Sequence, residues 1–126
     1  MADLCEVFVI DVRGIVPFRD TKYCVCVSVA RNKYVLIDTQ HREMYDDFQI
    51  SAKKYDFLKG IDRYVSCSAI YEFDNSRIKN IDQVIGVLQY DDMKKIIEKI
   101  RNSKVIKQID KDSVLPELEE WLLDNS

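Results

Sequence analysis

Four polar side chains have the types that cleavage of a phosphodiester without a metal requires. These candidate catalytic residues are Lys22, Thr39, His41 and Arg42. The reaction needs a base for the attacking hydroxyl, an acid for the leaving oxygen, and donors that stabilise the negative charge of the transition state. Histidine is the side chain whose unperturbed pKa suits proton transfer near neutral pH, and this chain has one. Lysine, arginine and threonine can donate hydrogen bonds to phosphate oxygens.

An expected β-hairpin brings these four side chains together. A turn at Arg31–Lys33 joins two strand-like runs, Lys22–Ala30 and Tyr34–Asp38. Eight or nine residues from the turn centre, Lys22 and Tyr23 on one strand meet Gln40 and His41 beyond the other. We therefore expect the candidate residues at one edge of the sheet.

Each candidate also has an ordinary structural interpretation. His41 can simply be solvated, and Arg42 can form an exposed ion pair with the adjacent Glu43. Lys22 at a strand start is typical of a surface residue, and the Thr39 hydroxyl can cap a turn. Only their expected convergence favours a shared chemical role.

Four residues in the segments before and after the expected hairpin are candidates for contacts with RNA. They are Arg13, Arg19, Gln40 and Tyr45. Arginine side chains neutralise phosphates and release counterions, which favours binding of a nucleic-acid backbone. An exposed tyrosine can stack on an unpaired base.

The elements that must position these residues are short strands followed by late helices. The pattern predicts a small, strongly bent antiparallel β-barrel of the α+β class, SH3-like, with a C-terminal helix and a short extra tail helix. Met93, Ile96, Ile97 and Ile100 form the apolar stripe of the main helix, Tyr90–Asn102. The other expected elements are strands at Cys5–Val12, Asp47–Ile50, Arg63–Cys67 and Ile70–Phe73, an extended Arg77–Leu88, and helices at Ala52–Leu58 and Ser113–Leu123 with Pro116 in the first turn of the latter.

Length and charge indicate one domain with an acidic end. The chain has 126 residues, 47% of them hydrophobic, and a net charge of −3. Residues 1–110, the expected barrel, carry 18 basic and 17 acidic side chains, and residues 111–126 carry one basic and five acidic. The near-neutral body can hold a basic groove, whereas the overall charge argues against a strongly basic coating protein.

The cysteines and the apolar runs favour a cytoplasmic protein. The four cysteines lie in apolar, strand-like runs without zinc spacing, so we expect buried reduced thiols and no metal site. Cys24 and Cys26 should face the same side of one strand. No signal peptide and no membrane-spanning run is expected.

The segment around the main helix resembles the MazF/PemK family of toxin ribonucleases. The family has an isoleucine-glycine-x-leucine strand that runs into a helix opening with acidic residues and methionine; here these are Ile85–Leu88 and Asp91–Met93. Tyr34–Thr39 is similar to the strand that delivers the family's active-site threonine. Lys22 occupies the place of the family's catalytic arginine, as in related toxins that use a lysine there.

This resemblance implies a toxin-type, sequence-specific endoribonuclease that cleaves single-stranded RNA without a metal or cofactor. It also implies a homodimer and restraint by an antitoxin, either protein or RNA. The missing arginine and the acidic balance favour a second hypothesis, a catalytically inactive PemK-like barrel that binds protein or nucleic acid. A third is an ordinary SH3-like structural domain, because this scaffold supports many functions.

Overall fold

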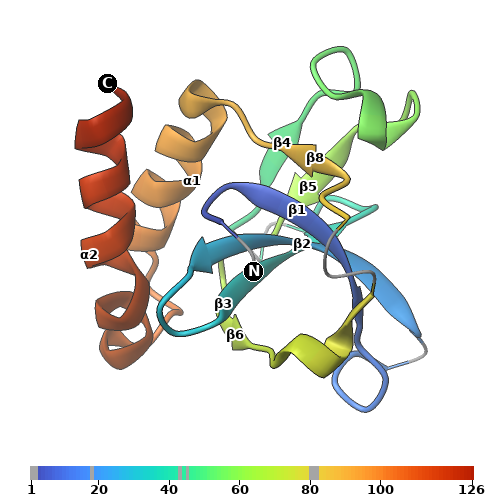
Figure 1. Ribbon diagram of the computed structural model, residues 1–126, viewed down its shortest axis with the longest axis horizontal. Helices are drawn as coiled ribbons and strands as arrows, with labels where there is room; N and C mark the ends of the chain where they lie inside the picture. The colour runs from blue at the N-terminus through green and yellow to red at the C-terminus, as the bar shows by residue number, and fades with distance from the viewer. Residues whose placement is uncertain (1–2, 18, 43, 45, 80–82) are drawn as a thin grey trace.

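The protein consists of a strongly curled antiparallel sheet with two helices on one side of it (Figure 1). It is therefore of the α+β class. The computed structural model describes residues 3–17, 19–42, 44, 46–79 and 83–126. The strands are β1 (Glu6–Asp11), β2 (Thr21–Ser28), β3 (Lys33–Asp38), β4 (Phe48–Ile50), β5 (Arg63–Val65), β6 (Tyr71–Glu72), β7 (Ile78–Lys79) and β8 (Gly86–Val87). The helices are α1 (Tyr90–Asn102) and α2 (Gln108–Asn125), with 3-10 turns η2 (Asp56–Leu58) and η3 (Asn75–Arg77).

The sheet curls enough to enclose one of its own faces. Its strand order is β4-β5-β3-β2-β1-β7, with β6 also paired to β3 and β8 also paired to β1. Because β3 and β1 each pair with different strands along their length, the sheet bends into a half-barrel. The curled antiparallel architecture predicted from the sequence is confirmed at this level.

Both faces of the central strands are buried, and alternate residues supply the two cores. The face toward the helices holds Val7, Val25, Val27, Val35 and Ile37. The enclosed face holds Phe8, Ile10, Cys24, Cys26, Tyr34 and Leu36, with Phe73 and Ile78. Cys24 and Cys26 thus share a face, as predicted. All four cysteines are buried free thiols, and burial raises their pKa to about 12.

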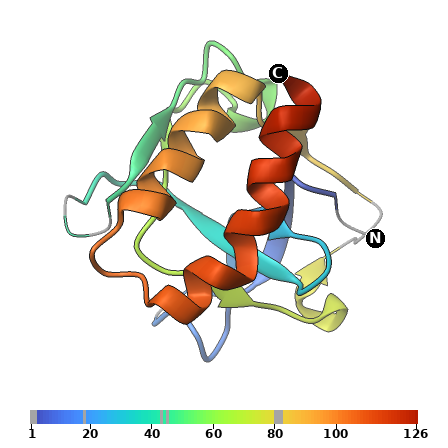
Figure 2. The ribbon, with the colours of Figure 1, turned by 90° about the vertical axis from the view of Figure 1, so that its left-hand side faces the viewer.

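The two helices lie side by side across one face of the sheet (Figure 2). Helix α1 has the predicted bounds, and the stripe of Met93, Ile96, Ile97 and Ile100 is fully buried against the sheet. Within the described residues, no helix is both long enough and apolar enough to cross a membrane.

Two predicted helices differ from the structure. The α-helix expected at Ala52–Leu58 is wrong: only Asp56–Leu58 forms a 3-10 turn, because Tyr55 is extended and its hydroxyl bonds the buried Asp92 of α1. The tail helix begins at Gln108 rather than Ser113, which leaves Pro116 inside it. In the first turns of α2, Lys111 connects this helix to the end of α1, since its ammonium donates to the carbonyls of Arg101 and Ser103 (2.9 and 2.6 Å).

Candidate functional site

The start of β2 and the end of β3 meet at the side of the sheet away from the helices (Figure 1). Tyr23 pairs with Ile37 and not with Gln40 or His41, so the β2–β3 register is shifted by three or four residues from the predicted pairing. The cause is an earlier turn: β2 ends at Ser28, where the register is irregular, and β3 already begins at Lys33. As a result Asp38, not Gln40 or His41, faces Lys22.

Lys22 and Asp38 form a largely buried ion pair at this edge. The ammonium of Lys22 donates to Oδ1 of Asp38, and the two side chains are 17% and 14% exposed. Burial lowers the pKa of Lys22, and the positive charges of Arg19 and Arg42 lower it further. The carboxylate of Asp38 opposes this effect because it favours the charged ammonium.

An open cleft of about 510 Å³, here called the Arg42 cleft, surrounds this pair. It is lined by Val16, Pro17, Arg19, Lys22, Asp38, Thr39, Gln40 and Arg42. Lys22, Thr39 and Arg42 are thus brought together with two of the expected RNA contacts, Arg19 and Gln40. Three basic side chains against one carboxylate suit an anionic ligand.

A second cleft of about 250 Å³, here called the Arg63 cleft, adjoins the first. It is lined by Arg19, Thr21, Lys22, Tyr23, Ile37, Thr39 and Arg63. The Arg63 guanidinium lies over the Tyr23 ring, with its carbon 4.6 Å from the ring centroid. Arg19, Lys22 and Thr39 line both clefts, so the two clefts meet at the end of the hairpin.

His41 lines a different hollow, the His41 pocket, together with Asp47, Gln49 and Tyr64. Its Nδ1 lies 2.6 Å from Oδ1 of Asp47, whose other oxygen accepts from the backbone N–H of Arg42 (2.7 Å). The ring also contacts Tyr64, with centroids 5.6 Å apart. Asp47 therefore fixes the orientation of the imidazole, which the structure does not bring into the Arg42 cleft.

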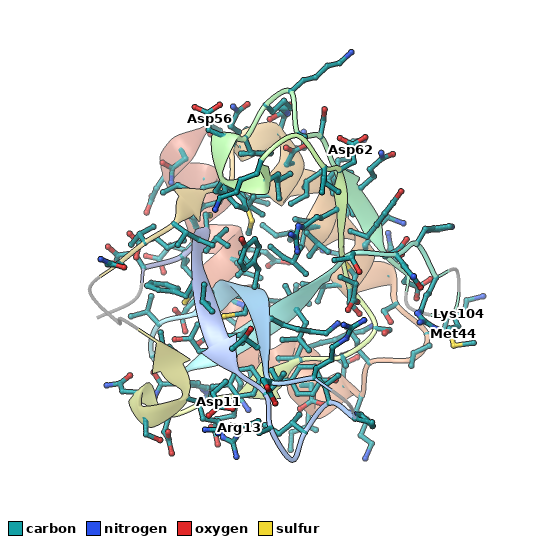
Figure 3. The ribbon with its side chains drawn as sticks, turned by 90° about the vertical axis from the view of Figure 1, so that its right-hand side faces the viewer. Asp11, Arg13, Met44, Asp56, Asp62 and Lys104 are labelled. Atoms are coloured by element: carbon teal, nitrogen blue, oxygen red, sulfur yellow. The ribbon has the colours of Figure 1, made fainter. Side chains whose placement is uncertain are left out.

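Arg13 lines neither of the two clefts, but it lines a neighbouring hollow that shares Val16, Pro17 and Arg19 with the Arg42 cleft. Arg13 forms a two-point ion pair with Asp11 (Nε and Nη2, 3.0 and 2.7 Å), and the pair lies at one end of the molecule, far from Asp56 and Asp62 (Figure 3). This pairing holds the pKa of Asp11 well below its usual range. Tyr45 lies outside the described residues.

Sequence reasoning missed three site residues, Asp38, Asp47 and Arg63. Asp38 is the last residue of a predicted strand, but the predicted register placed Gln40 or His41 opposite Lys22 and so did not pair Lys22 with Asp38. Asp47 and Arg63 come from segments whose place depends on the order of β4, β5 and β3 in the sheet. No local pattern in the sequence gives that order.

Among the described residues, no group of three or more His, Cys, Asp or Glu side chains is arranged to hold a metal ion. Comparison with known proteins adds no assignment, because no family model and no curated protein matches the chain. The two clefts are therefore the features of the molecule that indicate a function.

Proposed function

We propose that the chain is a toxin-type endoribonuclease that binds single-stranded RNA in the Arg42 cleft and cleaves it without a metal. The observation that carries the proposal is the convergence of Arg19, Lys22 and Arg42 around Thr39 in one open cleft. A phosphodiester is the anion that fits a site with several cationic donors and a hydroxyl.

The reaction uses the RNA's own 2′-hydroxyl as nucleophile. Its oxygen attacks the adjacent phosphorus, and the bond from phosphorus to the 5′-oxygen breaks, giving a 2′,3′-cyclic phosphate and a 5′-hydroxyl end. Asp38 accepts the proton of the 2′-hydroxyl, and Lys22, whose pKa is lowered, donates a proton to the leaving oxygen. Arg19 and Arg42 stabilise the additional negative charge on the phosphorane, and Thr39 orients the phosphate.

Incubation of the purified protein with a long single-stranded RNA in EDTA tests this proposal. We expect discrete cuts with cyclic phosphate ends, and losses of at least about 100-fold in Lys22→Ala and Thr39→Ala. Arg31→Ala, which removes an exposed charge at the opposite end of the hairpin, should cleave like the wild type. Intact RNA with every protein would contradict nuclease activity.

A second candidate is a PemK-like barrel that binds RNA or protein without cleaving it. Two features of the site favour it. Asp38 already neutralises Lys22, and His41 lines a separate pocket and not the Arg42 cleft. Binding of the same RNA, weakened in Arg42→Ala but without cuts, would establish this module instead of the nuclease.

The same proposal includes the type of barrel, the oligomeric state and the protein's partner. The strand-to-helix motif at Ile85–Leu88 and Asp91–Met93 supports a barrel of the SH3-like MazF/PemK type, and with it a homodimer and an antitoxin partner. Sedimentation equilibrium at several protein concentrations tests the dimer, and a mass of 14.8 kDa at all of them would contradict it.

A further inference from the structure

We infer that the Arg63 cleft is a second phosphate subsite, so that the ligand is a strand whose neighbouring phosphates occupy both sides of the hairpin end. This inference deepens the proposed function and rests on it for the identity of the ligand. It assigns to Arg63 and Tyr23 a binding role outside the reacting group.

The alternation of side chains along β2 and β3 separates the two clefts. Tyr23 and Ile37 belong to the face toward the helices, and they line the Arg63 cleft. Lys22 and Asp38, one position before and one after, point to the enclosed face; Asp38 lines the Arg42 cleft, and Lys22 lines both clefts. A strand that passes over the hairpin end therefore meets basic side chains on each side of it.

Arg63 extends from β5 across β3 to reach Tyr23 on β2. The three strands are neighbours in the order β5-β3-β2, and the guanidinium lies over the Tyr23 ring. Stacking of this kind fixes the plane of the guanidinium and leaves its edge for hydrogen bonds. Arg63 is thus held in place before any ligand arrives.

The Arg63 cleft is lined by basic side chains, Arg19, Lys22 and Arg63, and none of its described lining residues is a carboxylate. Lys22 is already paired with Asp38, which lines the Arg42 cleft. Nε of Arg63 is buried, and within the described residues no hydrogen-bond acceptor reaches it. The adjacent Asp62 is already engaged, because it accepts from the Gln49 side chain and the Ala52 backbone (3.0 and 2.8 Å). A buried unsatisfied donor is costly, and a bound anion supplies negative charge at the guanidinium.

Binding of 2′-O-methyl oligouridylates tests the subsite separately from cleavage, since the methyl group blocks the attacking oxygen. The probes are a dinucleotide with one phosphate and a tetranucleotide with three. For the tetranucleotide, Arg63→Gln should weaken binding about tenfold and reduce the slope of log K against log salt by about 0.7. The dinucleotide, which fills only the Arg42 cleft, should bind both proteins equally.

Three results would overturn the subsite: equal losses for both probes, no loss for either, or no binding of either probe to the wild type. Arg31→Gln is the matched control, with the same charge removed at the far end of the hairpin. Arg63→Lys keeps the charge but not the stacked fork, so it should retain the salt slope and bind the tetranucleotide more weakly. If Arg63→Gln does not fold, unchanged binding by Arg63→Lys overturns the inference. Oligonucleotide binding without cleavage of RNA would preserve the subsite and refute the nuclease.

Discussion

The Lys22–Asp38 ion pair contributes to the stability of the hairpin edge as well as to its proposed chemistry. Asp38→Asn leaves a largely buried ammonium without its counter-ion, so we expect it to lower the free energy of unfolding by about 1–3 kcal/mol. The double variant Lys22→Met/Asp38→Leu removes both charges and should recover at least half of that loss. Urea unfolding at pH 7 measures both values. A double variant less stable than Asp38→Asn would contradict this account.

The Asp11–Arg13 ion pair predicts a loss of stability in acid. Because the pair lowers the pKa of folded Asp11, the folded state binds fewer protons than the unfolded state, whose aspartate pKa is about 3.9. The stabilisation is therefore complete above that value and is lost as the pH falls through the folded pKa. Thermal melts should give the wild type a higher Tm than Asp11→Asn at pH 6, and this difference in Tm should narrow below pH 4. A difference in Tm that stays constant with pH would exclude this linkage.

At the scale of single elements, Pro116 is the residue that we expect to destabilise helix α2. It lies nine positions into α2, is exposed, and has no backbone N–H to bond the carbonyl of Asp112. Pro116→Ala should therefore raise the free energy of unfolding by about 1–3 kcal/mol and the Tm by several degrees. Differential scanning calorimetry of the two proteins measures this change. A lower Tm in the variant would mean that the proline stabilises the helix.

The elements also show which features the sequence could predict. Helix α1 was predicted correctly because its apolar stripe and its charged ends are local features. The β2–β3 register was wrong by three or four residues because the turn comes earlier than predicted; there, Ser28 and the N–H of Val29 bond Glu117 of α2, almost ninety residues away. Likewise, the contact of Tyr55 with α1 replaced the helix predicted at Ala52–Leu58. Lys22, Thr39 and Arg42 converge nevertheless, because this shift keeps them at the same end of the hairpin.

At the scale of the whole molecule, charge is divided between two sides. The acidic helix α2 packs on α1 and, through Glu117, on the β2 end of the hairpin turn, whereas the two basic clefts lie at the hairpin's other end. A negatively charged strand is therefore drawn toward the clefts and away from α2. Helix α2 therefore packs on α1 and the sheet and, among the described residues, does not line either of the two clefts.

The same packing makes α2 part of one cooperative unit. Val114 and Leu118 are fully buried in the core shared by the sheet and α1, and Trp121 stacks on Tyr90 of α1 with centroids 5.7 Å apart. Trp121 is the only tryptophan, so its fluorescence reports whether α2 is docked. We expect its urea transition to coincide with that of far-UV circular dichroism, as in two-state unfolding. An earlier fluorescence transition would instead make the helix a separable tail, because the sheet and α1 would then remain folded without it.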